Sequence, residues 1–139
     1  MKTVTALEKQ TYGMVVDDNK DMLTLLSDLI EQLTPAKVEC FASPEAALQA
    51  FEAAPEKFRF VITDLEMPGM NGIQLCEHLH AIAPNLKVLL STGSRVLTEA
   101  EARLSGFCAL LNKPFPLAAM ERTLARAGVC ATAGTWSEA

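Results

Sequence analysis

Polar side chains follow four apolar segments of this sequence, at the point where each segment ends. Asp17 and Asp18 come after the first segment, and Asp64 comes after the third. Thr92 follows the fourth segment and Lys113 the fifth. Carboxylates bind hard divalent cations, and a hydroxyl and an ammonium can stabilise a negatively charged phosphoryl group. These residue types therefore indicate metal-assisted phosphoryl chemistry, provided that the fold brings them together.

The balance of charge in such a cluster favours a metal ion. Three carboxylates held close together repel one another, and one lysine against three aspartates leaves a formal charge of −2. Mg²⁺, bound by one or two carboxylates together with waters and phosphate oxygens, would balance that charge. An aspartate beside the ion could attack phosphorus and form an acyl phosphate. Singly, each of these residues could be a helix cap or a turn residue; their joint occurrence favours a site.

The spacing of apolar residues predicts five strands that alternate with five helices. The expected strands are Tyr12–Val16, Val38–Phe41, Phe60–Thr63, Val88–Leu90 and Phe107–Leu111. Helices are expected after Asn19, Ser43–Pro44, Gly72, Thr98 and Pro116. This alternation is typical of an α/β protein with a parallel sheet covered on both faces. Ligands of such sheets bind beyond the carboxyl ends of the strands, where the polar residues stand.

Composition limits the domain organisation and the partners. The chain has 139 residues, enough for one domain, which we expect to span residues 11–127 between a flexible arm at 1–10 and a short tail at 128–139. A net charge of −5 without a basic run argues against nucleic-acid binding. We see no signal peptide and no membrane-spanning stretch, so we expect a cytoplasmic protein with reduced thiols at Cys40, Cys76, Cys108 and Cys130.

Four motifs carry a resemblance to a known family, the receiver domains of two-component response regulators, including the chemotaxis regulators. They are Val15–Asp18, Asp64–Gly72, Leu90–Gly93 and Lys113–Phe115. The resemblance covers roughly residues 11–127. It implies a flavodoxin-like (βα)5 fold, a three-layer sandwich with a five-stranded parallel sheet in the order 2-1-3-4-5.

The same resemblance implies a role for each site residue. Asp64 is expected to be the phosphoacceptor, with Asp18 and Asp64 as direct Mg²⁺ ligands and Asp17 as a ligand that acts mainly through water. The backbone carbonyl of Glu66 is expected to complete the protein's share of the metal shell. Thr92 is expected to be the switch hydroxyl and Lys113 the contact to the phosphoryl group.

Three positions depart from the family's usual pattern. The family often has Tyr or Phe three residues before the lysine, and here that position is Leu110, while Phe107 lies three residues earlier. The usual coupling of Thr92 to a rotating aromatic ring is therefore not expected in its ordinary form. Gly93 stands where Ala is common and gives the loop more freedom. Glu66 adds a carboxylate at the mouth of the site.

The resemblance implies a phosphorylation-dependent switch that is not an enzyme beyond self-catalysed phosphotransfer and autodephosphorylation. The donor is expected to be a histidine kinase or a histidine phosphotransfer protein. Phosphorylation is expected to shift the surface formed by the fourth helix, the fifth strand and the fifth helix, through which a homodimer could form. We expect no DNA-binding output domain in this chain. A stand-alone regulator and the receiver module of a hybrid sensor kinase both remain open.

Two other classes of function compete with this interpretation. A phosphatase of the haloacid-dehalogenase type also uses an aspartate nucleophile and Mg²⁺, but it needs a second aspartate where Glu66 stands. A receiver-like interaction module that ignores phosphorylation would not need the acidic cluster or Lys113. The sequence contains neither GxGxxG nor a P-loop, which argues against nucleotide binding.

Overall fold

The computed structural model describes residues 11–93, 97–113 and 115–126. The arm expected at 1–10, the tail expected at 128–139 and Cys130 lie outside these residues. Within them, five parallel strands form one sheet in the order β2-β1-β3-β4-β5. The strands are β1 (Tyr12–Val16), β2 (Lys37–Phe41), β3 (Phe58–Asp64), β4 (Lys87–Thr92) and β5 (Ala109–Asn112). This order confirms the expected flavodoxin-like topology.

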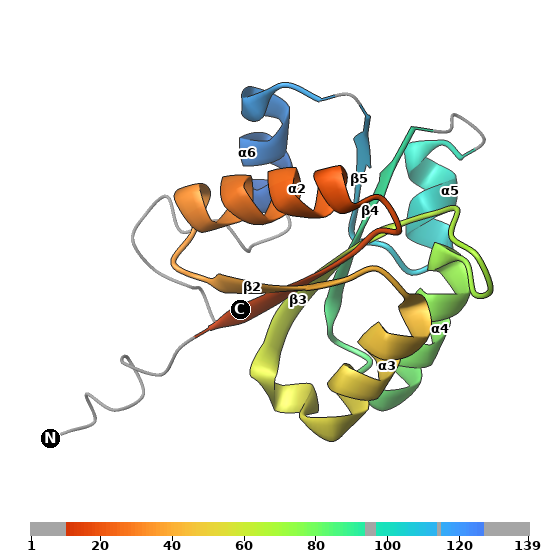
Figure 1. Ribbon diagram of the computed structural model, residues 1–139. Helices are drawn as coiled ribbons and strands as arrows, with labels where there is room; N and C mark the ends of the chain where they lie inside the picture. Colours follow the sequence, from red (N-terminus) through yellow and green to blue (C-terminus); the bar gives the residue numbers. More distant parts are fainter. Residues whose placement is uncertain (1–10, 94–96, 114, 127–139) are drawn as a thin grey trace, which may run out of the picture.

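Helices cover both faces of the sheet (Figure 1). On one face lie α2 (Lys20–Leu33) and α6 (Leu117–Arg126), and on the other lie α3 (Pro44–Ala53), α4 (Gly72–Ile82) and α5 (Glu99–Leu104). A short 3-10 helix, η1 (Pro55–Lys57), leads into β3 and was not expected from the sequence. The five helices expected from the sequence correspond in order to α2, α3, α4, α5 and α6, so the expected fourth and fifth helices are α5 and α6.

The core divides into two layers because strand side chains alternate between the two faces of the sheet. Ile62 of β3 and Leu89 of β4 pack with α2 and α6, whereas Val61 and Leu90 pack with α3, α4 and α5. All four side chains are at most 1% exposed. These apolar rows hold the strands in register, and the register decides which residues meet at the carboxyl edge of the sheet.

Side-chain caps fix where the helices begin. Asn19 and Ser43 accept hydrogen bonds from the backbone N–H groups of Met22 and Ala46, as the sequence predicts. Thr98 and Glu101 form the expected capping box of α5. Because the caps of α2, α3 and α5 follow the carboxyl ends of β1, β2 and β4, they fix the loops at the edge of the sheet where the candidate site lies.

The fifth strand begins later than the sequence predicts, at Ala109 instead of Phe107. Gly106 has φ +105, and the N–H of Phe107 donates to the carbonyl of Ala102, so this segment turns off the end of α5 before the strand starts. Phe107 is buried, 2% exposed, between α5 and the sheet. The apolar run was therefore read correctly as buried and wrongly as a strand over its first two residues.

The three described cysteines differ in burial, and His80 of α4 forms a hydrogen bond. Cys76 is buried and Cys108 is half-buried, whereas Cys40 is exposed, and all three are free thiols. His80 forms a hydrogen bond between its Nε2 and the carbonyl oxygen of Leu86, at 2.9 Å. This bond ties the end of α4 to the loop that precedes β4.

In the part of the chain that the structure describes, no helix has the length and hydropathy to cross a membrane.

Candidate functional site

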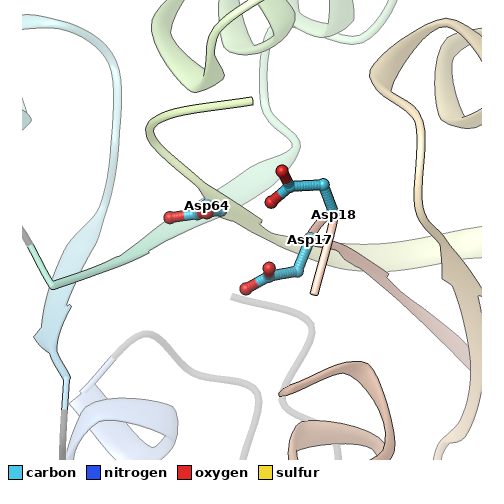
Figure 2. A group of neighbouring side chains, drawn as sticks. All are labelled: Asp17, Asp18 and Asp64. Atoms are coloured by element: carbon cyan, nitrogen blue, oxygen red, sulfur yellow. The ribbon is translucent and has the colours of Figure 1, made fainter. Parts of the chain in front are cut away.

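The carboxyl edge of the sheet brings together the residues that the sequence singled out. Asp17 directly follows β1, Asp64 ends β3, Thr92 ends β4, and Lys113 directly follows β5. Figure 2 shows Asp17, Asp18 and Asp64 gathered at this edge. Each of the three offers a carboxylate oxygen that lies within 4.8 Å of the others. The convergence expected from the alternation of strands and helices is therefore observed.

Asp17 and Asp18 have opposite exposures although they are neighbours in sequence. Asp17 is 1% exposed, and its Oδ1 accepts a hydrogen bond from the backbone N–H of Asn19 at 2.9 Å. Asp18 is exposed. A buried carboxylate that is already hydrogen-bonded is held rigidly, whereas an exposed one is free to meet an ion from solvent. The two aspartates could therefore contribute to a cation site in different ways, Asp17 as a buried and fixed carboxylate and Asp18 as an exposed one.

Lys113 links the ends of three strands. Its Nζ donates to Asp17 Oδ2 at 2.8 Å and lies 3.5 Å from Asp64 Oδ1. The Lys113 side chain is 16% exposed, so the ion pair with Asp17 is largely removed from water. A buried carboxylate without such a partner would be costly. Lys113 thus stabilises the acidic cluster when no cation is bound.

The pKa of Asp64 is raised above its ordinary value. Burial is the main cause, and the charge of Asp17 adds to it. Lys113 and the N–H of Leu65, which donates to Asp64 Oδ1 at 2.8 Å, act in the opposite direction without cancelling the effect of burial. A carboxylate whose charge is incompletely compensated favours the approach of a cation.

Thr92, at the end of β4, and Glu66, in the loop after β3, are the two other predicted site residues. Thr92 is 2% exposed, and its carbonyl oxygen accepts from the N–H of Lys113 at 2.8 Å, which aligns the ends of β4 and β5. Glu66 is exposed and lies two residues after Asp64. Leu110 is half-buried and packs with the cluster formed by α3, α4, α5 and the sheet.

The loop after Asp64 depends on two glycines. Gly69 has φ +87, which L-residues with side chains rarely adopt. A Cβ on Gly72 would lie 2.3 Å from the carbonyl oxygen of Asp64, so only glycine allows α4 to begin this close to the acceptor. The N–H of Gly72 donates to Leu65 at 2.8 Å. No local sequence pattern indicates that a side chain at Gly72 would clash with the acceptor residue.

Sequence reasoning missed three other residues near the site. Asn71 and Gln74 form a full capping box at the start of α4, although the sequence analysis named no cap there. Their N-cap and N3 spacing was a usable signal. Ser91 lies within the motif Leu90–Gly93, which implies no role for it, and its hydroxyl is buried beside the site. A serine within an apolar strand was the signal that could have found it.

The donor set fits a hard divalent cation. All the candidate side-chain ligands are carboxylate oxygens, and within the described residues no histidine or cysteine joins the group. Three carboxylates face one ammonium, and the pKa of Asp64 is raised, so the site carries uncompensated negative charge. Oxygen ligands and excess negative charge suit Mg²⁺ better than softer metals.

Comparisons with known proteins agree with this description. The family model of the response regulator receiver domain matches residues 14–125. The response regulator protein FleR of Pseudomonas aeruginosa is 36% identical over 114 residues, which cover 81% of this chain and 24% of FleR. The C4-dicarboxylate transport transcriptional regulatory protein DctD of Rhizobium meliloti is 32% identical over 102 residues, 73% of this chain and 22% of DctD. The chain thus spans about a quarter of the length of these curated relatives.

Solved structures show the same architecture. FixJ-N superposes with a TM-score of 0.72 and 27% identity, covering 86% of this chain and 94% of FixJ-N. The chemotaxis protein CheY4 of Vibrio cholerae gives a TM-score of 0.75 at 23% identity, covering 86% of this chain and 99% of CheY4, which bears on the fold alone.

The fold and the acidic edge define a class, the flavodoxin-like domains with a cluster of carboxylates beyond the sheet. Within that class, the chain belongs to the response regulator receiver domain family of two-component signalling. Domains of this family are regulatory phosphoacceptors and are not generally classed as enzymes, and they bind Mg²⁺ at an acidic pocket. In this chain, Asp17, Asp18 and Asp64 form a cluster of carboxylates that could hold such an ion.

Proposed function

We propose that this chain is a phosphorylation-dependent switch that accepts a phosphoryl group on Asp64. The observation that carries the proposal is the convergence of three carboxylates within 4.8 Å, with the Lys113 ammonium 3.5 Å from Asp64 Oδ1. The acceptor is Asp64 and not Asp17 because Asp17 is fully buried and engaged by Lys113 at 2.8 Å. Asp64 keeps 14% of its side chain exposed, so a donor can reach it.

The other residues of the site hold the cation and the product. Asp18 and Asp64 would bind Mg²⁺ directly, Asp17 would bind it mainly through water, and the backbone carbonyl of Glu66 would complete the protein's ligands. When bound, Mg²⁺ neutralises charge on the phosphoryl oxygens. Lys113 contributes a second positive charge to the same oxygens, and Thr92 donates its hydroxyl to them once the group is in place.

The transfer itself is a displacement at phosphorus. A carboxylate oxygen of Asp64 attacks the phosphorus of a phosphohistidine, a new O–P bond forms, and the N–P bond breaks. The donor imidazole leaves as the electron pair returns to its nitrogen, and the product on this chain is an aspartyl phosphate. Attack by water on that phosphorus later restores Asp64 and releases inorganic phosphate. The donor is a histidine kinase or a histidine phosphotransfer protein.

The added charge and acceptor oxygens change the neighbouring surface. Thr92 ends β4, and residues 97–104, including α5, follow it, so movement of Thr92 toward Asp64 shifts α5 against β5 and α6. Leu104 of α5 is 88% exposed and Leu117 of α6 is 51% exposed, so each of these helices presents one large apolar side chain to solvent. A partner protein or a second copy of the chain binds there. The receiver domain spans residues 11–127.

Intact-mass measurement tests the proposal. Wild type incubated with Mg²⁺ and acetyl phosphate gains one acid-labile phosphoryl group, and the gain requires Mg²⁺. The Asp64→Asn variant gains none, while the control variant Glu66→Gln, which changes a side chain but keeps the backbone carbonyl, still gains one. Labelling of Asp64→Asn equal to that of wild type would overturn the assignment.

A further inference from the structure

Ser91, one residue before Thr92, has a buried hydroxyl that the proposed reaction does not use. Its side chain is 0% exposed, and its Oγ has no hydrogen-bond partner among the described residues. Leaving a buried hydroxyl unpaired is costly, and such groups are rare in folded proteins. By contrast, the buried hydroxyl of Thr34 donates to the carbonyl of Ile30 at 2.9 Å. The unpaired hydroxyl of Ser91 therefore suggests a second conformation of the site in which this hydroxyl forms a hydrogen bond.

Strand register places Ser91 on the same face of the sheet as the phosphoacceptor. Asp64 and Ser91 are paired Cα partners of β3 and β4. Side chains alternate along each strand, and the residues two positions earlier, Ile62 and Leu89, both face α2 and α6. Asp64 and Ser91 therefore project from that face as neighbours. Thr92, the proposed switch hydroxyl, projects from the opposite face.

Lys113 must pass over Ser91 to reach its partner. In the strand order β1-β3-β4-β5, Lys113 follows β5 and its Nζ contacts Asp17, which follows β1. The side chain therefore crosses the carboxyl ends of β4 and β3, and β4 carries Ser91 there. Leu111, two residues before Lys113, is paired with Ser91 and faces the same layer.

We propose that Ser91 is a positioning residue, the acceptor that receives the ammonium of Lys113 when its bond to Asp17 opens. The inference deepens the proposed function, on which it rests, because a cation at the carboxylate cluster would compete with the Lys113 ammonium for Asp17 Oδ2. Once released, Nζ withdraws from β1 toward β3 and β4 and donates to Ser91 Oγ. The ammonium is then fixed beside Asp64, in position for a phosphoryl group on that residue.

A double-mutant cycle on Mg²⁺ affinity tests this role without any phosphorylation. In the wild-type background, Ser91→Ala weakens Mg²⁺ binding by roughly three- to tenfold, since the displaced ammonium loses one hydrogen bond. In the Lys113→Met background no ammonium needs an acceptor, and Ser91→Ala leaves the dissociation constant unchanged. The dissociation constants are measured by titration calorimetry with MgCl₂ on the full chain.

Three control measurements separate positioning from packing. Ser91→Cys fills nearly the same space with a weak acceptor and weakens Mg²⁺ binding as Ser91→Ala does. Ser91→Ala leaves the melting temperature of the metal-free protein unchanged or higher, because it removes an unpaired group. Thr34→Ala, which removes a paired hydroxyl far from the site, lowers the melting temperature and leaves Mg²⁺ affinity unchanged.

The outcomes distinguish this inference from the proposed function. Equal losses of affinity from Ser91→Ala in both backgrounds, or no loss in either, overturn the role of Ser91 and leave phosphorylation of Asp64 untouched. Wild type that binds Mg²⁺ but gains no phosphoryl group overturns the proposed function, whatever the cycle gives. Failure of wild type to bind Mg²⁺ overturns both.

Discussion

Lys113 Nζ lies 2.8 Å from Asp17 Oδ2, so one ion pair joins the ends of β5 and β1 across the two strands between them. Asp17 is 1% exposed, and removing its partner leaves a buried charge without compensation. We expect Lys113→Ala to lower the free energy of unfolding by about 3 kcal/mol without metal. Urea denaturation measures this loss, and Mg²⁺ should restore most of it by replacing the missing positive charge.

Lys57 provides the matched control for that prediction. It pairs with Glu39, but both side chains are 34% exposed. Water already stabilises both charges, so Lys57→Ala should cost about 1 kcal/mol or less, and Mg²⁺ should not recover it. Equal losses in the two variants, or a Lys113→Ala protein as stable as wild type without metal, would contradict the role given to the Lys113–Asp17 pair.

The raised pKa of Asp64 makes the metal-free protein sensitive to pH. Burial favours the protonated form in the folded state, so the folded protein holds its proton to higher pH than the unfolded chain does. The contribution of Asp64 to stability therefore falls as pH rises from the unfolded pKa through the folded pKa. Asp64→Asn removes this titration.

The measurement compares wild type and Asp64→Asn by urea denaturation at several pH values without metal. The variant should be more stable than wild type above the folded pKa, and the difference should shrink as the pH falls below both pKa values. A difference that grows on acidification would mean that the folded state favours the charged form. Taking the difference between the two proteins cancels the titration of the other carboxylates.

Gly72 should be intolerant of any side chain. A Cβ there would lie 2.3 Å from the carbonyl oxygen of Asp64, and both groups are backbone-fixed. We expect Gly72→Ala to destabilise the fold by about 2–3 kcal/mol, the range of severe overpacking. At Gly93 a Cβ would meet its nearest heavy atom, Lys113 Cβ, at 4.0 Å, so Gly93→Ala should change stability by less than about 0.5 kcal/mol. Thermal denaturation of both variants checks the contrast.

The exposed leucine of α5 offers a test of the output surface. Leu104 is 88% exposed, so Leu104→Ser should leave the fold intact while it removes an apolar contact from the surface of α5, β5 and α6. Sedimentation with Mg²⁺ and beryllofluoride, a phosphoryl mimic, should show self-association of wild type that Leu104→Ser weakens about tenfold. Leu25→Ser on α2, where the leucine is 46% exposed, is the control and should not change self-association. Equal effects of both variants would exclude this surface.

The sequence predicted the parts of the fold that depend on local pattern. Apolar runs and caps at Asn19, Ser43 and Thr98 placed the strands and helices, and the rule for open sheets placed Asp64 and Lys113 at one edge. The start of β5 was wrong because periodicity cannot distinguish a buried turn at Gly106–Phe107 from a buried strand.

What the sequence could not supply was contact across the sheet. The roles of Gly72 and Ser91 depend on register and on the distance between elements, which no local pattern encodes. That Lys113 pairs with Asp17 and not with Asp18 also depends on contact across the sheet. Strand alternation turns one of the two aspartates inward, and only the register shows which one.

The most direct test of the central claim is to locate the phosphoryl group by chemistry at the residue. Borohydride reduces an aspartyl phosphate to homoserine, and the modified peptide can be sequenced by mass spectrometry. After treatment with Mg²⁺ and acetyl phosphate, the proposed function predicts homoserine at position 64 and unmodified aspartate at positions 17 and 18. Homoserine at either of those two positions, or at none of the three while the protein carries a phosphoryl group, would contradict it.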